Sequence, residues 1–405
     1  WCADFRRPRR DESTPANQSR RPTTDTLNLK RGSSRAKDEV EAARELWEAI
    51  GQADISFCLF FCSPDYDVKK LGPALAEHFG DLPMLGCTTA GEISPTGYLS
   101  GAITGVSIAS PDFRVVMRRI DQLNAFDLDD GEKTITSLLA ELAEVGDPPT
   151  SENTFALLLI DGLSLQEERV VAGLCRGIGD IQLFGGSAGD EENFSATYLF
   201  HDGAFHDNAA VVALVQTQRP FHVFKTQHFV PSDAKLVVTG ADPANRVVTE
   251  INGDPAGAEY ARLVGLEVDK LTPMIFATYP VVVRLGGDYY VRSIQKVNED
   301  GSLTFFCAID EGVVLTIAQG VDFIQNLEDA FVGVQKAVGV PELVIGCDCI
   351  LRKLESEQKG IKAQISELMA KNNVIGFATY GEQFNAMHVN QTFTGVAIGA
   401  MSDGG

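Results

Sequence analysis

The sequence lacks a hydrophobic run long enough to cross a membrane, which takes about 18 consecutive apolar residues. Its longest apolar run, ISFCLFFC at 55–62, has only the length of a buried strand. The motifs CxxC and CxxCH are also absent, which excludes a zinc ribbon and a covalently attached haem. With 44% hydrophobic and 22% charged residues, the composition is that of a soluble globular protein with no membrane partner.

Positive charge is scarce outside the N-terminal segment. Residues 1–37 contain 10 lysines and arginines against 4 acidic residues, so the remaining chain holds 24 against 52 of the totals of 34 and 56. So acidic a body repels phosphate backbones, and we expect no nucleic-acid partner. The first segment is rich in Arg, Pro, Ser and Thr without apolar periodicity, so we interpret 1–37 as a disordered basic extension.

The 8 cysteines are an ordinary density for a chain of 405 residues. Most of them lie in apolar patterns, where free thiols behave as small hydrophobic side chains. No secretory signal segment is recognised, so we expect a reducing, cytoplasmic setting. In CDC, a strand would place Cys347 and Cys349 on one face, but two thiolates alone make a poor metal site.

The length predicts two domains with internal repetition rather than a single core. In the first, 38–218, helices are expected near 36–50, 67–79, 129–145 and 165–177, with strands between them and a hairpin turning on Asp202-Gly203. In the second, 219–402, a short helix begins at Pro255 and longer helices are expected over 320–338 and 351–371. The fold class is therefore α/β, with two layered sheet-plus-helix domains.

Two glycine-rich segments invite a catalytic interpretation. FGGSAG at 184–189 has the G-x-S-x-G spacing of a nucleophile elbow around Ser187, but the residues that follow indicate loop and strand instead of the required helix. GCTTAGEI at 86–93 contains Cys87 with no associated histidine and lacks the lysine of a phosphate loop. We therefore favour a close-approach turn and a buried thiol, with backbone amides at strand ends free to bind a small ligand.

Histidine is rare, with 6 in the chain. His78, His201 and His206 lie near a helix end or the Asp-Gly turn and are expected at the surface, and His388 precedes the last strand. PFHVFKTQHF at 220–229 contains His222 and His228. In one strand they would be about 20 Å apart at ~3.3 Å per residue, so at most one of them binds a given ligand. The pattern alone favours a packed core histidine over a cofactor ligand.

Several motifs in order resemble the FIST domain. GCTTAGEI, GVSIAS and LFGGSAGDEENFSATYLFHDGAFHDNAAVVALV resemble its N-terminal half. VTEINGDPAGAEY, VRSIQKVNEDGSLTFFCAIDEG, CILR, GFATYGEQF and NQTFTGVAI resemble its C-terminal half. The resemblance covers about residues 38–400 and implies a sensory module that binds a small ligand and is not an enzyme.

Within that family the chain is most similar to the stand-alone, NosP-type proteins that bind haem and sense nitric oxide. KTQHFVPSDAKLVVTGADPANRVVTEI places His228 where a generic FIST domain is expected to have an aromatic residue. The resemblance implies that His228 binds the iron of haem b, with His388 or His222 as alternatives. It also implies that Phe224 and Phe229 form the apolar wall and that Arg284 and Arg292 bind the propionates.

The implied partners are nitric oxide and a separate histidine kinase or cyclic-di-nucleotide enzyme, and a homo-oligomer is left open. The alternative is a FIST module that binds a small metabolite, such as an amino acid, in a glycine-lined cleft.

Overall fold

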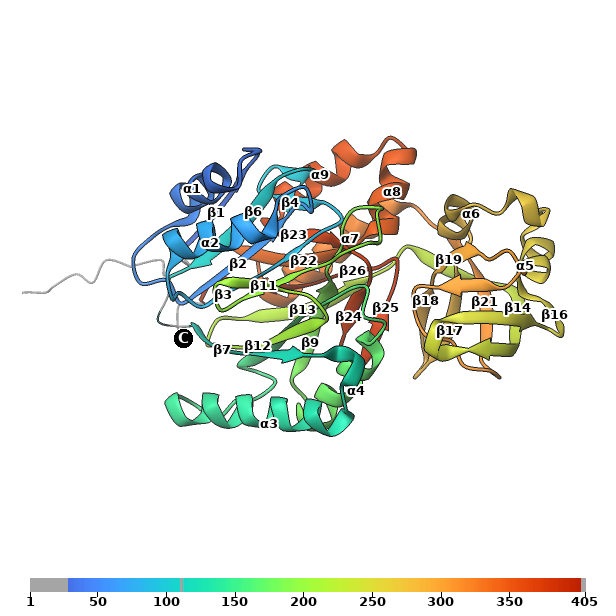
Figure 1. Cartoon of the computed structure of the whole chain (residues 1–405), viewed down its shortest axis with the longest axis horizontal. Coiled ribbons are helices and arrows are strands. Elements are labelled where there is room, and N and C mark those ends of the chain that lie inside the picture. Colours follow the sequence, from blue (N-terminus) through green and yellow to red (C-terminus); the bar gives the residue numbers. More distant parts are fainter. Residues whose placement is uncertain (1–27, 110, 112, 402–405) are drawn as a thin grey trace, which may run out of the picture.

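The computed structural model describes residues 28–109, 111 and 113–401. It contains three α/β units, which together form the core, and an inserted β unit of residues 229–320 that stands to one side of the core (Figure 1). No helix in the described part of the chain is both long enough and apolar enough to span a membrane.

Each α/β unit repeats one order of elements: strand, helix, strand, helix, strand, hairpin, strand. Unit 1 comprises β1 (Leu29–Ser34), α1 (Glu39–Ile50), β2 (Phe57–Cys62), α2 (Val68–Phe79), β3 (Met84–Thr88), β4 (Glu92–Ser94), β5 (Gly97–Leu99) and β6 (Ile103–Ile108). Unit 2 comprises β7 (Phe113–Asp121), α3 (Leu128–Val145), β8 (Thr154–Ile160), α4 (Glu167–Gly177), β9 (Gln182–Ser187), β10 (Leu199–His201), β11 (Ala204–His206) and β12 (Ala209–Thr217).

Unit 3 follows the same order but is interrupted after its first strand. It comprises β13 (Phe221–Thr226), α7 (Phe323–Val338), β22 (Leu343–Cys349), α8 (Ile350–Gln358), α9 (Lys362–Lys371), β23 (Val374–Thr379), β24 (Glu382–Phe384), β25 (Met387–Val389) and β26 (Phe393–Ile398). The β unit lies between β13 and α7. It comprises β14 (Phe229–Asp242), β15 (Val247–Ile251), β16 (Asp254–Pro255), α5 (Ala256–Val264), α6 (Pro273–Thr278), β17 (Val281–Leu285), β18 (Asp288–Arg292), β19 (Ile294–Val297), β20 (Leu303–Phe305) and β21 (Val314–Gly320).

Every core sheet is completed by a hairpin from another unit. The sheet orders are β1-β6-β2-β3-β10-β11, β7-β12-β8-β9-β24-β25 and β13-β26-β22-β23-β4-β5. Unit 1 thus receives its hairpin from unit 2, unit 2 from unit 3, and unit 3 from unit 1. The chain passes from unit 2 to unit 3 at 218–220, but this exchange joins the two predicted domains across that boundary in both directions.

The loops that precede the three hairpins meet in a closed ring of backbone hydrogen bonds. The bonds that link successive units run from Gly189 N to Thr88 O at 3.0 Å, from Ser187 N to Gly381 O at 2.9 Å and from Ala90 N to Ala378 O at 2.8 Å. Because each bond joins two different units, the ring fixes all three units relative to one another.

Hydrophobic side chains cover both faces of the core sheets, which explains the long apolar strand sequences. One shared cluster, containing for example Phe61, Phe155 and Phe377, joins the inner faces of all three sheets. The outer faces pack separately against α1 and α2, α3 and α4, and α7 and α9. The mixed α/β architecture of sheets and helices predicted from the sequence is therefore confirmed.

Four local expectations need correction. Residues 29–34, assigned to the disordered extension 1–37, form β1 because their backbone pairs with β6; the extension up to residue 27 lies outside the described residues. The helix expected over 351–371 is two helices, since Gly360 adopts φ 67 between α8 and α9. The strand expected over 221–230, FHVFKTQHFV, ends at Thr226, where the chain leaves the core. His201 is only 8% exposed because its hairpin pairs with β3.

Equivalent buried glutamates close the hairpins of units 1 and 3. Glu92 accepts hydrogen bonds from Thr89 Oγ1 at 2.7 Å and from the Ala102 amide at 3.2 Å. Glu382 accepts from the amide and hydroxyl of Thr392 at 3.1 and 2.6 Å. Burial raises the pKa of Glu92 to about 7 and the pKa of Glu382 well above its usual range. Glu92 is therefore protonated in mildly acidic solution, where an ordinary glutamate is ionised.

The Glu92 carboxyl predicts a stability that falls as pH rises. Its pKa is raised from 4.5 to about 7 in the folded state, so the native protein keeps a proton that the unfolded chain releases between these values. The free energy of unfolding should drop by about 3 kcal/mol over this window through Glu92. Urea titrations at pH 5 and pH 8 should show a smaller drop for Glu92→Gln than for the exposed control Glu77→Gln. An unchanged drop in Glu92→Gln would contradict the assignment.

Candidate functional site

His228 lies at the neck, which we define as the two chain crossings between the core and the β unit, Gln227–His228 and Val321–Asp322. The imidazole is 0% exposed. Its backbone oxygen accepts a hydrogen bond from the Val321 amide at 2.8 Å, so the two crossings are held together. The ring packs between Phe229 and Phe323, with ring centroids 4.2 and 4.4 Å away.

Both ring nitrogens of His228 are bound by charged side chains of α8. Arg352 Nη1 lies 2.9 Å from Nδ1, and because a guanidinium only donates, Nδ1 must be an acceptor. The ring proton is therefore on Nε2, which donates to Glu355 at 2.9 Å. Burial, together with the Arg352 charge, lowers the pKa of His228 despite the Glu355 hydrogen bond. The imidazole is thus neutral and fully engaged.

The contacts of His228 continue into the core. Arg352 Nε donates to Asp348 at 2.6 Å, and the Tyr98 hydroxyl donates to the same carboxylate. Glu355 also accepts from Lys359 Nζ at 2.5 Å. A buried chain of charged and polar groups therefore connects the neck with α8 and with the hairpin that unit 1 contributes to the third sheet.

The other residues predicted to surround haem do not gather around His228. Phe229 contacts its ring, whereas Phe224 packs against Phe393 in the outer cluster of the third sheet. Arg284 is exposed beside Tyr289, with 5.8 Å from its guanidinium carbon to the ring centroid. Arg292 donates to the backbone oxygen of His388 at 3.0 Å. The structure brings together only one of these four side chains with the histidine.

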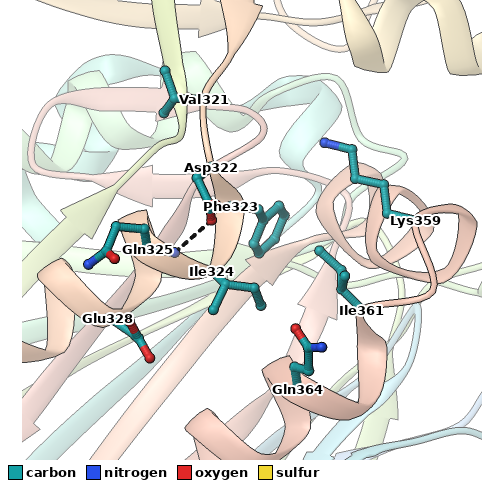
Figure 2. Close-up of a pocket in the computed structure, with 9 residues that line it drawn as sticks. All are labelled: Val321, Asp322, Phe323, Ile324, Gln325, Glu328, Lys359, Ile361 and Gln364. Atoms are coloured by element: carbon teal, nitrogen blue, oxygen red, sulfur yellow. Dashed lines mark hydrogen bonds between the residues drawn. The ribbon is translucent and has the colours of Figure 1, made fainter.

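An open cavity of about 490 Å³ lies beside the neck, between the start of α7 and the α8–α9 turn (Figure 2). Phe323 lines this cavity and also contacts the His228 ring, while His228 itself does not line it. Lys359, the cation of the lining, is already bound to Glu355. The residues present do not fit a haem held by His228, because both imidazole nitrogens are engaged and Phe323 packs on the ring.

His388, the alternative ligand, is also packed. Its exposed fraction is 3%. Nε2 lies 3.3 Å from the backbone oxygen of Phe306 and Nδ1 lies 3.4 Å from the amide nitrogen of Gln383. Burial lowers the pKa of this imidazole, so it too is neutral. In the described part of the chain, no group of three or more His, Cys, Asp or Glu side chains has the arrangement of a metal site.

The two candidate nucleophiles are buried. Ser187 has no exposed surface, and its hydroxyl accepts a hydrogen bond from Gln383 Nε2 at 3.0 Å. Gly185, two residues before Ser187, is required by close packing: a Cβ there would lie 2.0 Å from Leu158 O. Cys87 is likewise unexposed, and burial raises the pKa of its thiol well above normal. Both segments are structural, as their sequence context indicated.

A smaller cavity, which we call the interbody cleft, lies between the core and the β unit. Its volume is about 230 Å³. The core contributes Gly162, Leu163, Leu165, Glu167, Phe194 and Tyr380 to the lining. The β unit contributes Asn245, Arg246, Gln295, Thr304, Phe305 and Phe306.

Three residues with an unfavourable backbone conformation line the interbody cleft. Leu165, Phe194 and Arg246 line it and have positive φ values of 56°, 50° and 56°. The other non-glycine residues with positive φ in the described ranges are Asn and Asp, which tolerate this region, and Gln122, Glu191 and Gln391. Large side chains adopt it at a cost of about 1–3 kcal/mol each, and such strain clusters where a function requires the conformation.

Arg246 joins the two walls of the interbody cleft. Its Nη2 donates to Glu167 at 2.6 Å and to Glu168 at 2.7 Å, both at the start of α4 in the core. Its Nη1 donates to the Phe306 oxygen at 2.7 Å within the β unit. Although burial opposes it, the two carboxylates hold the pKa of Arg246 above its usual range, so the guanidinium stays charged.

An anchored loop presents Phe194 to the interbody cleft. The Asp190 carboxylate accepts the amide of Phe194 at 2.8 Å and those of Ser195 and Ala196 at 2.8 and 2.9 Å. It also accepts the Tyr380 hydroxyl, and the Tyr380 ring stacks under Phe194 with centroids 4.6 Å apart. Phe306 faces them from the β unit, 6.2 Å from Phe194. Sequence reasoning missed this cleft, because no local pattern marks Phe194 or Arg246.

Removing the Arg246 charge should be costly. In Arg246→Met, Glu167 is left buried at 1% exposure without its cation, so unfolding should become easier by about 3–5 kcal/mol. The matched control is Arg118→Met, which breaks a pair with Glu141 whose side chains are 50% and 49% exposed and should cost less than about 1 kcal/mol. Urea unfolding measures both variants. Equal losses would show that the Arg246 bridge does not hold the two bodies together.

The chain was compared with known proteins. The family models of the FIST N domain and the FIST C domain match residues 56–254 and 256–385. No curated protein matches the sequence. Among solved structures, the crystal structure of a chorismatase aligns with a TM-score of 0.35 and 8% sequence identity, over 92% of this chain and 99% of that one. So weak a likeness carries no argument about activity.

Proposed function

This chain belongs to the FIST family of sensory signalling modules, and from that premise we propose that it senses a small metabolite bound in the interbody cleft. The observation that carries the proposal is the strain at this cleft, where Leu165, Phe194 and Arg246 all have positive φ. Neither the His228 neck nor the glycine-rich segments combine an accessible cavity with strain of this kind.

The size of the interbody cleft favours a ligand about as large as an amino acid. Ordinary ligand pockets measure roughly 300–1,000 Å³, and this one measures about 230 Å³. Its lining offers one carboxylate and one guanidinium, the amides of Asn245 and Gln295, and aromatic side chains. Such a set can orient a small polar molecule, while excluding a planar group as large as a porphyrin.

Ligand binding would act on the angle between core and β unit. The two bodies are joined covalently through the neck alone, and the cleft lies between them. A ligand that contacts both walls binds the closed arrangement more tightly than an open one and shifts the population towards it. The changed outer surface would then alter contact with a separate histidine kinase or cyclic-di-nucleotide enzyme, the partners that the family resemblance implies.

A thermal-shift screen with the free amino acids and related small metabolites tests the proposal. A compound that binds at a hundredfold excess over its Kd adds about 2.7 kcal/mol and should raise Tm measurably. The shift should disappear in Asn245→Ala and Gln295→Ala, which both line the cleft. It should persist in Leu285→Ala, an exposed β-unit residue outside the lining. No shift with any compound, or a shift that survives both cleft variants, would refute the cleft as the sensory site.

Haem ligation through His228 stays a prediction that this geometry does not favour. Because Arg352 and Glu355 occupy both nitrogens, haem added to the purified protein should give a visible spectrum that is the same for wild type and His228→Gln. His388→Gln provides the matched comparison at the alternative histidine. A Soret band that is lost only in His228→Gln would instead establish haem binding at the neck.

A further inference from the structure

Negative charge exceeds positive charge at the interbody cleft. Glu167, which is 1% exposed, and Glu168 share the single guanidinium of Arg246. A third carboxylate, that of Asp161, accepts the amide of the lining residue Leu163 at 2.9 Å. The lining itself holds one acid, Glu167, and one cation, Arg246. Because Glu168 and Asp161 are bonded to lining residues, acids outnumber the cation around the cleft. The net charge of −22 for the whole chain adds to the attraction of cations.

Aromatic rings line the same cleft as Glu167. The rings of Phe194 and Phe306 lie 6.2 Å apart at an angle of 43°, one on each body. Phe194 is 38% exposed and is backed by the stacked ring of Tyr380. A cation within about 6 Å of a ring centroid is attracted by the negative ring face, and organic cations with bulky, weakly hydrated groups benefit most from such walls.

We propose that the interbody cleft selects a small organic cation, such as a quaternary or alkylated amine. Its charged group lies against Phe194 and Phe306 and neutralises the carboxylate charge that Arg246 leaves uncompensated. Because one ring belongs to the core and the other to the β unit, the cation draws the two bodies together. This inference rests on the proposed function and names the ligand class of the same site.

Two matched probes separate charge from shape. Choline and 3,3-dimethyl-1-butanol have nearly the same outline, but only choline carries a positive charge. In calorimetric titrations of the whole chain, choline should bind at least about tenfold more tightly than the neutral alcohol. Tetramethylammonium, the minimal cation of this class, should bind in competition with choline.

Variants of Phe194 test whether the aromatic rings cause the preference for choline. Phe194→Leu keeps an apolar side chain at a partly exposed position, so it should fold and yet weaken choline binding by about tenfold, while Phe194→Tyr should retain it. Leu285→Met, at an exposed β-unit position outside the lining, should leave the preference for choline over the alcohol unchanged.

Each result has a distinct meaning. Equal affinity for choline and the alcohol, or choline binding that Phe194→Leu leaves intact, overturns the inference. Absence of binding by both cations also overturns it, and the proposed function then survives if a metabolite from the thermal-shift screen still depends on Asn245 and Gln295. If that screen is negative as well, both proposals fall.

Discussion

The exchange of hairpins among the three α/β units is the constraint on which the rest of the structure depends. No core sheet is complete without strands from another unit, and the ring of backbone bonds through Thr88, Ser187 and Ala378 locks the exchange. Buried backbone groups have few alternatives to such pairing, because an unpaired one costs about as much as a lost hydrogen bond. The core is therefore tied together as one body, and the β unit is attached to it through the neck.

The core and the attached β unit each contribute one wall of the interbody cleft. Asp190 belongs to the segment that forms the ring, and its carboxylate also anchors the loop that carries Phe194. At the neck, neutral His228 is held by Arg352 and Glu355. The site is thus bounded by a wall of the core and a wall of the β unit, with a hydrogen-bonded neck beside it. This arrangement suits a protein that converts binding into a change of shape, in agreement with its family.

Much of the fold could be predicted from local patterns. The apolar strand at 55–62, the helices of unit 2 and the Asp202-Gly203 turn, with φ of 51° and 74°, follow from burial, periodicity and turn chemistry. The break at Gly360 also had a visible signal in the glycine itself. No local pattern indicated which sheet each hairpin would join. The alternation of apolar and polar residues predicts a strand but not the sheet that the strand joins.

Less of the candidate site than of the fold could be predicted from the sequence, for physical reasons. The role of His228 depends on Arg352 and Glu355, more than 120 residues away in the chain, as the separations of 124 and 127 show. Positive φ at Phe194 and Arg246 occurs in residue types that rarely adopt it, so residue type gives no signal of it. The family resemblance supplied the sensory function, but it directed attention to an imidazole that packing has already engaged.

The exchange of hairpins also affects how the protein folds during its synthesis. The second sheet is completed by β24 and β25, which end at Val389, near the end of the described chain. During translation, one edge of the unit 2 sheet would stay unpaired until almost all of unit 3 has been synthesised. Exposed edges attract other strands, so chaperone protection during translation should matter more for this fold than for one whose domains mature in sequence.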